Sequence, residues 1–165
     1  MAIIALNSAQ LLLTGYPVIA GAEGPMSIDI KDLLVAAGLG TFNSTTGWNI
    51  CFAREPKTPD QCITIFDSGG GEANPKWLLD YPSIQVRIRG AKGQYLAAWR
   101  KAKQVKDALL GLGPQSVNAH RIVSITMFSE ITPIGYDENE RPILTINLRL
   151  IVEPVHSALS NREAL

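Results

Sequence analysis

Within the segment Ile143 to Val152 every second residue is apolar, and this pattern constrains the fold more than any other part of the sequence. Successive side chains of a strand point to opposite faces, so a period of two predicts a long strand with one buried and one wet face. The segment Ile84 to Arg89 has the same period. The chain therefore contains a sheet whose faces differ in polarity. In the long segment the apolar positions are Leu144, Ile146, Leu148, Leu150 and Val152, and the polar ones are Thr145, Asn147 and Arg149.

Two further segments have the pattern of helices. Ser27 to Ala37 is predicted to be a short helix with Ser27 as its N-cap. Residues 94–112 are predicted to be a longer helix, which Gly111, Gly113 and Pro114 end. Its apolar stripe comprises Tyr95, Ala98, Trp99, Ala102, Val105 and Leu109. Further strands are predicted at Trp48 to Ala53, Cys62 to Asp67 and Arg121 to Ile131, and a helical turn from Asn74.

The order of these elements predicts an α+β fold with a mostly antiparallel or mixed sheet of about five strands and helices packed on one face. The last two strands are expected to form a long C-terminal hairpin. Their connection, Thr132 to Pro142, is longer than the usual two to five residues or so of a hairpin loop, and long loops often carry function. We divide the chain into an N-terminal arm (1–25), one α+β domain (26–154) and a C-terminal tail (155–165).

Composition indicates a protein that associates with other subunits. Only 18% of the residues are charged, against about 25% in a typical soluble domain. A small domain with so few charges has difficulty covering its surface, so we expect part of that surface to be buried in an oligomer. The net charge of zero does not indicate a general nucleic-acid binder. The longest apolar runs are shorter than a membrane helix needs, which indicates a cytosolic protein without a membrane partner.

The sequence contains no constellation that is typical of an enzyme. His120 and His156 have no catalytic motif around them, and Glu72, directly after the triple glycine 69–71, would repel a phosphate. Cys51 and Cys62 are too far apart for a C-x-x-C motif and are expected to be free, buried thiols. The acids Asp60, Asp67, Glu72 and Asp80 match no ion-binding loop. We therefore predict no enzyme activity and no catalytic, cofactor-binding or metal-binding residues.

Charges of opposite sign are separated along the chain. Tyr81 to Lys106 contains basic residues and no acid, whereas Ile122 to Glu140 contains acids and no base. These blocks are either two solvated faces or the two sides of a contact between copies, which closes into a ring if the rotation allows. For the second alternative, we expect interface residues on the polar strand faces and in the hairpin connection: Arg87, Arg89, Arg149, Tyr136, Asp137, Glu138 and Glu140.

The N-terminal segment is rich in apolar residues but has no sustained period of a helix or a strand. No Lys or Arg precedes the apolar run, so it does not have the pattern of a signal peptide. We expect either an extended arm that pairs with an open sheet edge of an adjacent subunit or a segment that folds back over its own core. The apolar residues that define the arm are Ile3, Ile4, Leu6, Leu11, Leu12 and Leu13.

The stretch from Ile50 to Gly70 has a strand, an E-P-x-x-P-D loop, and a second strand that ends in Asp before glycines. Ser83 to Gly90 then contains I-Q-V-x-I-R-G, and an amphipathic helix and a long hairpin ending near Pro154 follow. In this order, the motifs resemble the tail terminator, or tail completion, proteins of long-tailed bacteriophages. The resemblance covers roughly residues 26–154, and residues 1–25 have no counterpart in it.

The resemblance implies a structural assembly protein that forms a hexameric ring and has no catalytic residues. Such a ring docks on the last ring of tail-tube protein, ends its polymerisation, and presents a surface to the head connector or neck protein. It implies assembly in the host cytoplasm and a final place in the tail or neck of the virion, with DNA passing through the lumen without sequence-specific binding.

Three other classes of protein remain as alternatives. A different phage neck or head-completion connector protein would share the size and the lack of chemistry, and its partner would distinguish it. The basic strand and helix could indicate a nucleic-acid-binding module, although no aromatic residues alternate with Arg87 and Arg89 to stack on bases. A small enzyme is the alternative that fits the sequence least well.

Overall fold

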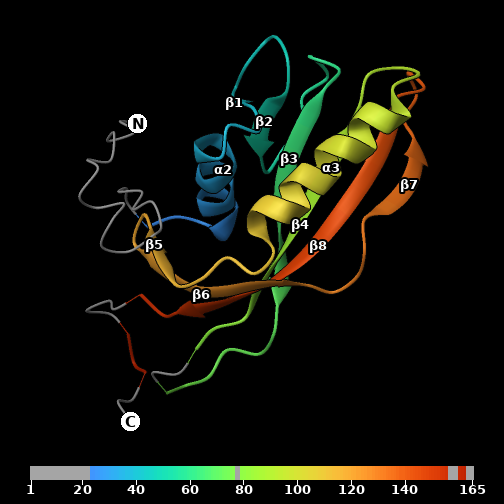
Figure 1. The fold of residues 1–165 in the computed structure, drawn as a ribbon. Coiled ribbons are helices and arrows are strands. Elements are labelled where there is room, and N and C mark those ends of the chain that lie inside the picture. Colours follow the sequence, from blue (N-terminus) through green and yellow to red (C-terminus); the bar gives the residue numbers. More distant parts are fainter. Residues whose placement is uncertain (1–22, 77–78, 156–159, 163–165) are drawn as a thin grey trace.

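The computed structural model of the protein describes residues 23–76, 79–155 and 160–162, which form two helices and a mixed, eight-stranded sheet (Figure 1). The helices are α2 (Met26–Ala36) and α3 (Tyr95–Leu109). The strands are β1 (Thr41–Phe42), β2 (Asn49–Phe52), β3 (Cys62–Gly70), β4 (Pro82–Arg89), β5 (Gln115–Val117), β6 (His120–Met127), β7 (Thr132–Tyr136) and β8 (Pro142–Glu153).

Strand β8 is the centre of the sheet. The strand order is β1-β2-β3-β4-β8-β6-β5, with β1, β2 and β3 parallel and the other pairs antiparallel. β4 pairs with one side of β8, while β7 and β6 share its other side. β7 pairs with the beginning of β8 and β6 with its end. The sheet curls around the helices, as Figure 1 shows.

The predicted α+β class and mixed sheet are confirmed, but the described residues contain more strands than the expected five or so. The segment Thr132 to Pro142, predicted to be a long loop, begins with strand β7. Its Pro133 and Gly135 flank a register shift, and these two turn-forming residues hid a short edge strand. The loop itself is limited to residues 137–141.

Two predicted details of the helices are wrong. The first helix begins at Met26 after Pro25, and Ser27 donates its amide and hydroxyl to the Asp67 carboxylate, at 3.0 and 2.5 Å. The Asn74 side chain accepts from the Lys76 amide, and residues 74–76 are not helical. In both places a side chain bonds to the backbone in a way that short-range sequence signals do not distinguish from an N-cap.

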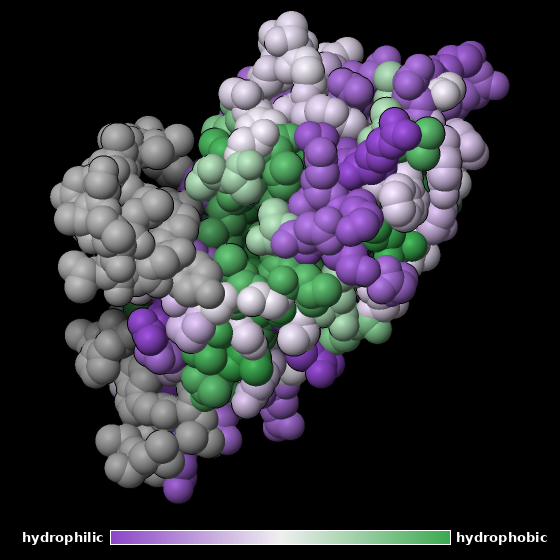
Figure 2. Space-filling model, viewed as in Figure 1, coloured by the Kyte–Doolittle hydropathy of each residue, from purple (hydrophilic) through white to green (hydrophobic). Residues whose placement is uncertain are grey.

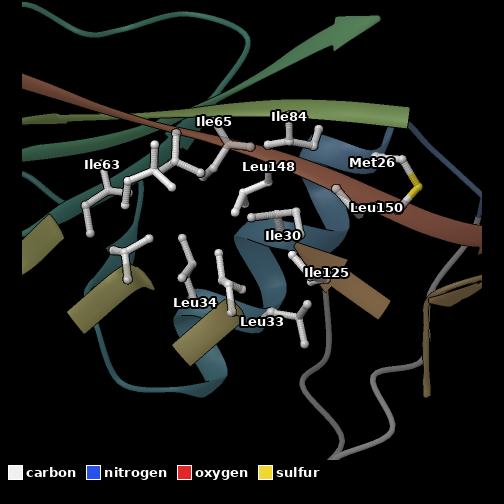
Figure 3. Packing of buried hydrophobic residues seen from close by; sticks show 14 of the residues in the cluster. Met26, Ile30, Leu33, Leu34, Ile63, Ile65, Ile84, Ile125, Leu148 and Leu150 are labelled. Atoms are coloured by element: carbon white, nitrogen blue, oxygen red, sulfur yellow. The ribbon is translucent and has the colours of Figure 1, made fainter. Parts of the chain in front are cut away.

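One face of the sheet and both helices share a single apolar cluster. Figure 3 shows Ile30, Leu33 and Leu34 of α2 among side chains of β3 and β8. From α3 the cluster takes Ala98, Ala102, Val105 and Leu109. The sheet contributes the alternating apolar residues that the sequence predicted, including Ile84, Val86, Ile88, Leu144, Ile146, Leu148, Leu150 and Val152. The opposite face of β4 and β8 therefore carries the polar side chains.

The predicted stripe of α3 is narrower than expected, because Tyr95 and Trp99 are 40% and 39% exposed. On this side of the molecule, hydrophilic residues gather over α3 and an apolar area extends between the two helices (Figure 2). Lys106 of the same helix points to the Glu130 carboxylate, at 2.6 Å. The small alanines of α3 let the helix approach the sheet closely, while its aromatic side chains lie at the border of the core.

A buried polar cluster ties α2 to the turn between β5 and β6. The Asp29 carboxylate is buried and accepts from Asn118 Nδ2 at 2.5 Å. His120 Nδ1 lies 2.5 Å from the second oxygen of the same carboxylate. Asn118 also donates to Asp32, which pairs with Lys31. These contacts give the buried carboxylates the partners that a buried charge requires.

The Asp29–His120 contact predicts a pH-dependent stability. The hydrogen bond to Asp29 raises the pKa of His120, and burial opposes this rise only in part. The stabilisation is therefore complete below the ordinary histidine pKa of about 6.5 and is lost as the pH rises through the higher pKa of the folded state. Urea denaturation between about pH 5.5 and 9 should show the free energy of unfolding falling across this interval.

The variant His120→Gln provides the control. It should lose on the order of 1.5–3 kcal/mol near pH 6, the usual contribution of a hydrogen bond to a charged group, and much less at high pH. Parallel pH profiles for His120→Gln and the unmodified protein would contradict the assignment.

Candidate assembly interface

The polar face of β4 and β8 lies opposite both described helices. Gln85 Nε2 donates to Asn147 Oδ1 at 3.1 Å across the two strands. Further along β8, the exposed Arg149 places its guanidinium carbon 4.6 Å from the ring centroid of Phe128, which is 50% exposed. This part of the face presents a cation and an aromatic ring side by side to the solvent.

The loop of residues 54–61 folds back over another part of this face and is held there by Arg89. The Arg89 side chain donates to the backbone carbonyls of Asp60, Pro56 and Pro59 at 3.0, 2.8 and 2.9 Å. Its Nη1 also lies 3.1 Å from the Glu55 carboxylate. Arg89 is only 4% exposed, so a single guanidinium fixes the E-P-K-T-P-D loop to the sheet.

The Arg89 charge is therefore satisfied within its own chain and needs no partner subunit. The period of two correctly placed Arg89 on the polar face, but it could not show that a loop of the same chain covers it. Arg87 is different: its Nε lies 3.3 Å from Glu55, and the side chain remains 32% exposed. Arg87 and Arg149 stay candidates for a contact with another subunit.

The tip of the β7–β8 hairpin is fixed by a second buried arginine. Arg141 donates to the Asp137 carboxylate at 2.7 Å, to the Lys57 carbonyl at 2.9 Å and to the Asp60 carboxylate at 2.9 Å. Burial raises the pKa of Asp137, but hydrogen bonds from the side chain and amide of Arg141 and the amide of Asn139 outweigh it and hold this pKa below its ordinary value. Asp137, predicted as a contact residue, is thus an internal anchor.

The acidic and basic blocks of the sequence meet within one chain. Lys92 pairs with Glu140, and Lys106 pairs with Glu130. The predicted contact of Glu140 with a neighbouring copy is therefore not needed to satisfy its charge. Of the four acids between Ile122 and Glu140, Glu138 is the one for which the described part of the chain provides no cationic partner.

A shallow groove of about 680 Å³ brings four of the predicted interface residues together: Arg87, Tyr136, Asp137 and Glu138. Sequence reasoning missed Ile134, which also lines it. Tyr136 and Ile134 are 62% and 54% exposed, and exposed aromatic and aliphatic side chains beside charged groups are typical of a protein contact. The remaining lining residues are Lys57, Asn139, Arg141 and Ile143. Arg149 and Glu140 do not line the groove. Ile134 and Tyr136 are two residues apart, and this strand-like spacing of two large side chains was the signal that could have indicated β7.

The two cysteines are free, as predicted, and lie together on the polar side of β2 and β3. Their sulfur atoms are 3.3 Å apart, and each lies 3.3 Å from Thr64 Oγ1. The hydrogen bond from Cys62 lowers the pKa of Cys51 to about 7. Among the described residues, no group of three or more His, Cys, Asp or Glu side chains is arranged to hold a metal ion.

The arm residues Ile3, Ile4, Leu6, Leu11, Leu12 and Leu13, together with His156, lie outside the described residues. None of the described helices is both long enough and apolar enough to cross a membrane.

Comparison with known families identifies the class of protein. Residues 33–154 match the family described as bacteriophage tail terminator protein, so the chain belongs to this family. No curated protein matches the chain. Its role is therefore a structural one in tail assembly, and its place is the tail of the virion.

Substitution of the two arginines of β4 should lower the free energy of unfolding by very different amounts. Arg89→Ala leaves Glu55 without its buried partner and releases three loop carbonyls, so it should lower the free energy of unfolding by about 3 kcal/mol or more. Arg87→Ala removes a partly exposed ion pair and should cost less than about 1 kcal/mol. Urea denaturation of both variants measures the difference, and equal losses would contradict the role given to Arg89.

Proposed function

We propose that the protein assembles as a closed ring of six copies on the end of the tail tube. The ring ends polymerisation of the tube protein and offers its other side to the head connector. Family membership and the low fraction of charged residues support this proposal. DNA passes through the lumen without sequence-specific contacts, and assembly takes place in the host cytoplasm.

The observation that carries the proposal is the rigid hairpin tip with its exposed apolar side chains. Tyr136 and Ile134 project from a strand whose five residues are all exposed, so they do not contribute to the apolar core. Arg141 holds the tip against the loop 54–61, which removes much of the conformational freedom that a contact would otherwise have to restrict. A fixed, partly apolar tip is suited to contact another subunit.

The tip and the Arg149–Phe128 surface differ in shape and in charge. A contact between two different surfaces is heterologous, and repeated heterologous contacts generate a ring when the rotation closes. The structure offers two such surfaces on one domain, so the tip of each copy can contact the other surface of the next copy around the proposed ring.

Capping of the tube tests the proposal directly. Tail-tube protein of the same phage is polymerised with the full-length protein, and electron microscopy measures tube length and the fraction of ends that carry a ring. Tyr136→Ser should lower this fraction on the order of tenfold, because truncation of an exposed aromatic anchor commonly costs more than about 1 kcal/mol. The matched control is Tyr81→Ser, which changes an exposed tyrosine outside the groove.

Three results would contradict the proposal: tubes of unchanged length in the presence of the unmodified protein, a single copy on each tube, or a preference for the head connector with no binding to tubes. The last result would identify a neck connector instead. The thermal unfolding temperature of each variant shows whether the domain remains folded.

We also propose that residues 1–25 form an arm that contacts an adjacent subunit. Deletion of residues 1–22 retains Pro25, the residue that precedes α2 and accepts from the Ile28 amide. The truncated protein should unfold at the same temperature as the full chain and cap tubes poorly. A truncated protein that is insoluble or unfolded would show that the segment belongs to the core.

A further inference from the structure

We propose that Glu138 of one copy binds Arg149 of the next copy, with Tyr136 packed against Phe128. This inference rests on the proposed ring and specifies its subunit contact. It identifies the hairpin tip as one side of the contact. The other side is the polar face of β4 and β8, which neither described helix covers.

The first side is an acid whose neighbours are already paired. Asp137 binds Arg141, and Glu140 pairs with Lys92. Glu138 lies between them on the exposed loop, lines the groove together with Tyr136, and has no cationic partner among the described residues. Tyr136 and Glu138 thus present an aromatic ring and a carboxylate within three residues of chain.

The second side is a cation with the complementary neighbour. Arg149 is exposed, and its guanidinium lies over the Phe128 ring. No carboxylate of the described residues pairs with Arg149, whereas Arg121, on the neighbouring strand β6, is paired with Glu153. The stacking on Phe128 fixes the direction of the guanidinium and leaves its edge available to a carboxylate.

The two sides cannot meet within one molecule. The hairpin loop joins β8 at Pro142, and Arg149 lies seven residues further along the same strand. At roughly 3.3 Å per residue, this separation is about 23 Å, well beyond the reach of a glutamate side chain. The contact therefore needs a second copy. In the proposed ring this contact repeats head-to-tail, with the tip of each copy on the acceptor surface of the next.

A second exposed cation with apolar neighbours is Arg100 of α3, one turn after Leu96, which is 56% exposed. Arg149 fits the tip better. It is held by an aromatic ring, so less side-chain freedom is lost on binding, and that ring is a partner for Tyr136. Arg100 serves as the competing site in the experiment.

Exchange of the two charges tests the contact. The full-length protein carrying Glu138→Arg, Arg149→Glu or both is mixed with tail-tube protein, and the fraction of ring-capped ends is counted by electron microscopy. Each single variant should lower this fraction about tenfold, because it replaces an attraction with a repulsion. The double variant should recover to within about threefold of the unmodified protein.

The double variant separates the proposed contact from local effects. An arginine at position 138 also lies near Arg87 and Lys57 in the groove, and this repulsion alone could disturb the tip. Only a direct contact with residue 149 predicts that the second substitution repairs the first. Glu72→Arg and Arg100→Glu are the matched controls, since both change exposed charges outside the proposed contact.

The outcomes distinguish a failure of the Glu138–Arg149 contact from a failure of the proposed ring. Failure of the double variant to recover, or recovery by Glu138→Arg with Arg100→Glu instead, overturns the inference. Normal capping by the single variants overturns it as well and leaves the ring in place. If the unmodified protein forms no ring on tubes, the proposed function fails together with the contact. Loss of DNA binding by Arg149→Glu with normal capping would identify a nucleic-acid surface instead.

Discussion

The apolar side of β8 is the constraint on which the rest of the structure depends. Its alternating residues are covered by side chains from both helices, and its backbone is paired on one side by β4 and on the other by β6 and β7. Once both helices occupy the apolar side, the polar side of β4 and β8 must be satisfied by loops of the same chain, by water or by another subunit. The candidate contact residues therefore lie on the polar side of the sheet or at its edge, away from the helices.

Two buried arginines determine how much of the polar side the chain itself covers. Arg89 and Arg141 approach the same loop, residues 54–61, from the sheet and from the hairpin. Buried guanidinium groups with several acceptors lose their hydration only when nearly every donor finds a partner, so this loop has few alternative positions. Its position in turn fixes the hairpin tip, which places Tyr136 and Glu138 at a defined distance from the sheet.

The sequence predicted the parts of the fold that depend on local periodicity. The period of two in Ile84 to Arg89 and Ile143 to Val152 identified the two central strands and their buried faces, and the spacing of Ala98, Ala102 and Val105 identified the helix. Strand β7 was missed because Pro133 and Gly135 are turn-forming residues, and its pairing depends on β8, more than ten residues away in some pairs.

The candidate site was predictable only in part, because the sequence does not show which arginines of the polar face are covered by a loop of the same chain. Arg87 and Arg89 have the same period, the same strand and the same polar face, yet a loop of the chain covers one and leaves the other partly exposed. This difference in exposure depends on the hydrogen bonds from Arg89 to the carbonyls of Pro56, Pro59 and Asp60. These residues lie about thirty positions away in the sequence, so a local pattern does not show the contact. Likewise, the two charge blocks did not show that Lys92 and Glu140 pair within one chain.

The proposed contact, one ion pair and one aromatic pair, is weak enough for a subunit that, as proposed, assembles only at the end of the tail tube. An exposed ion pair contributes about 0–1 kcal/mol and an aromatic pair about 0.5–1.5 kcal/mol, too little to hold free copies together. A tube end that binds several copies side by side raises their effective concentration to the millimolar range, where the same weak contact becomes effective. Each copy in a closed ring makes this contact twice, once through its tip and once through its acceptor surface. The rigid anchoring of the tip by Arg141 matters for this reason, because a contact this weak cannot also order a flexible loop.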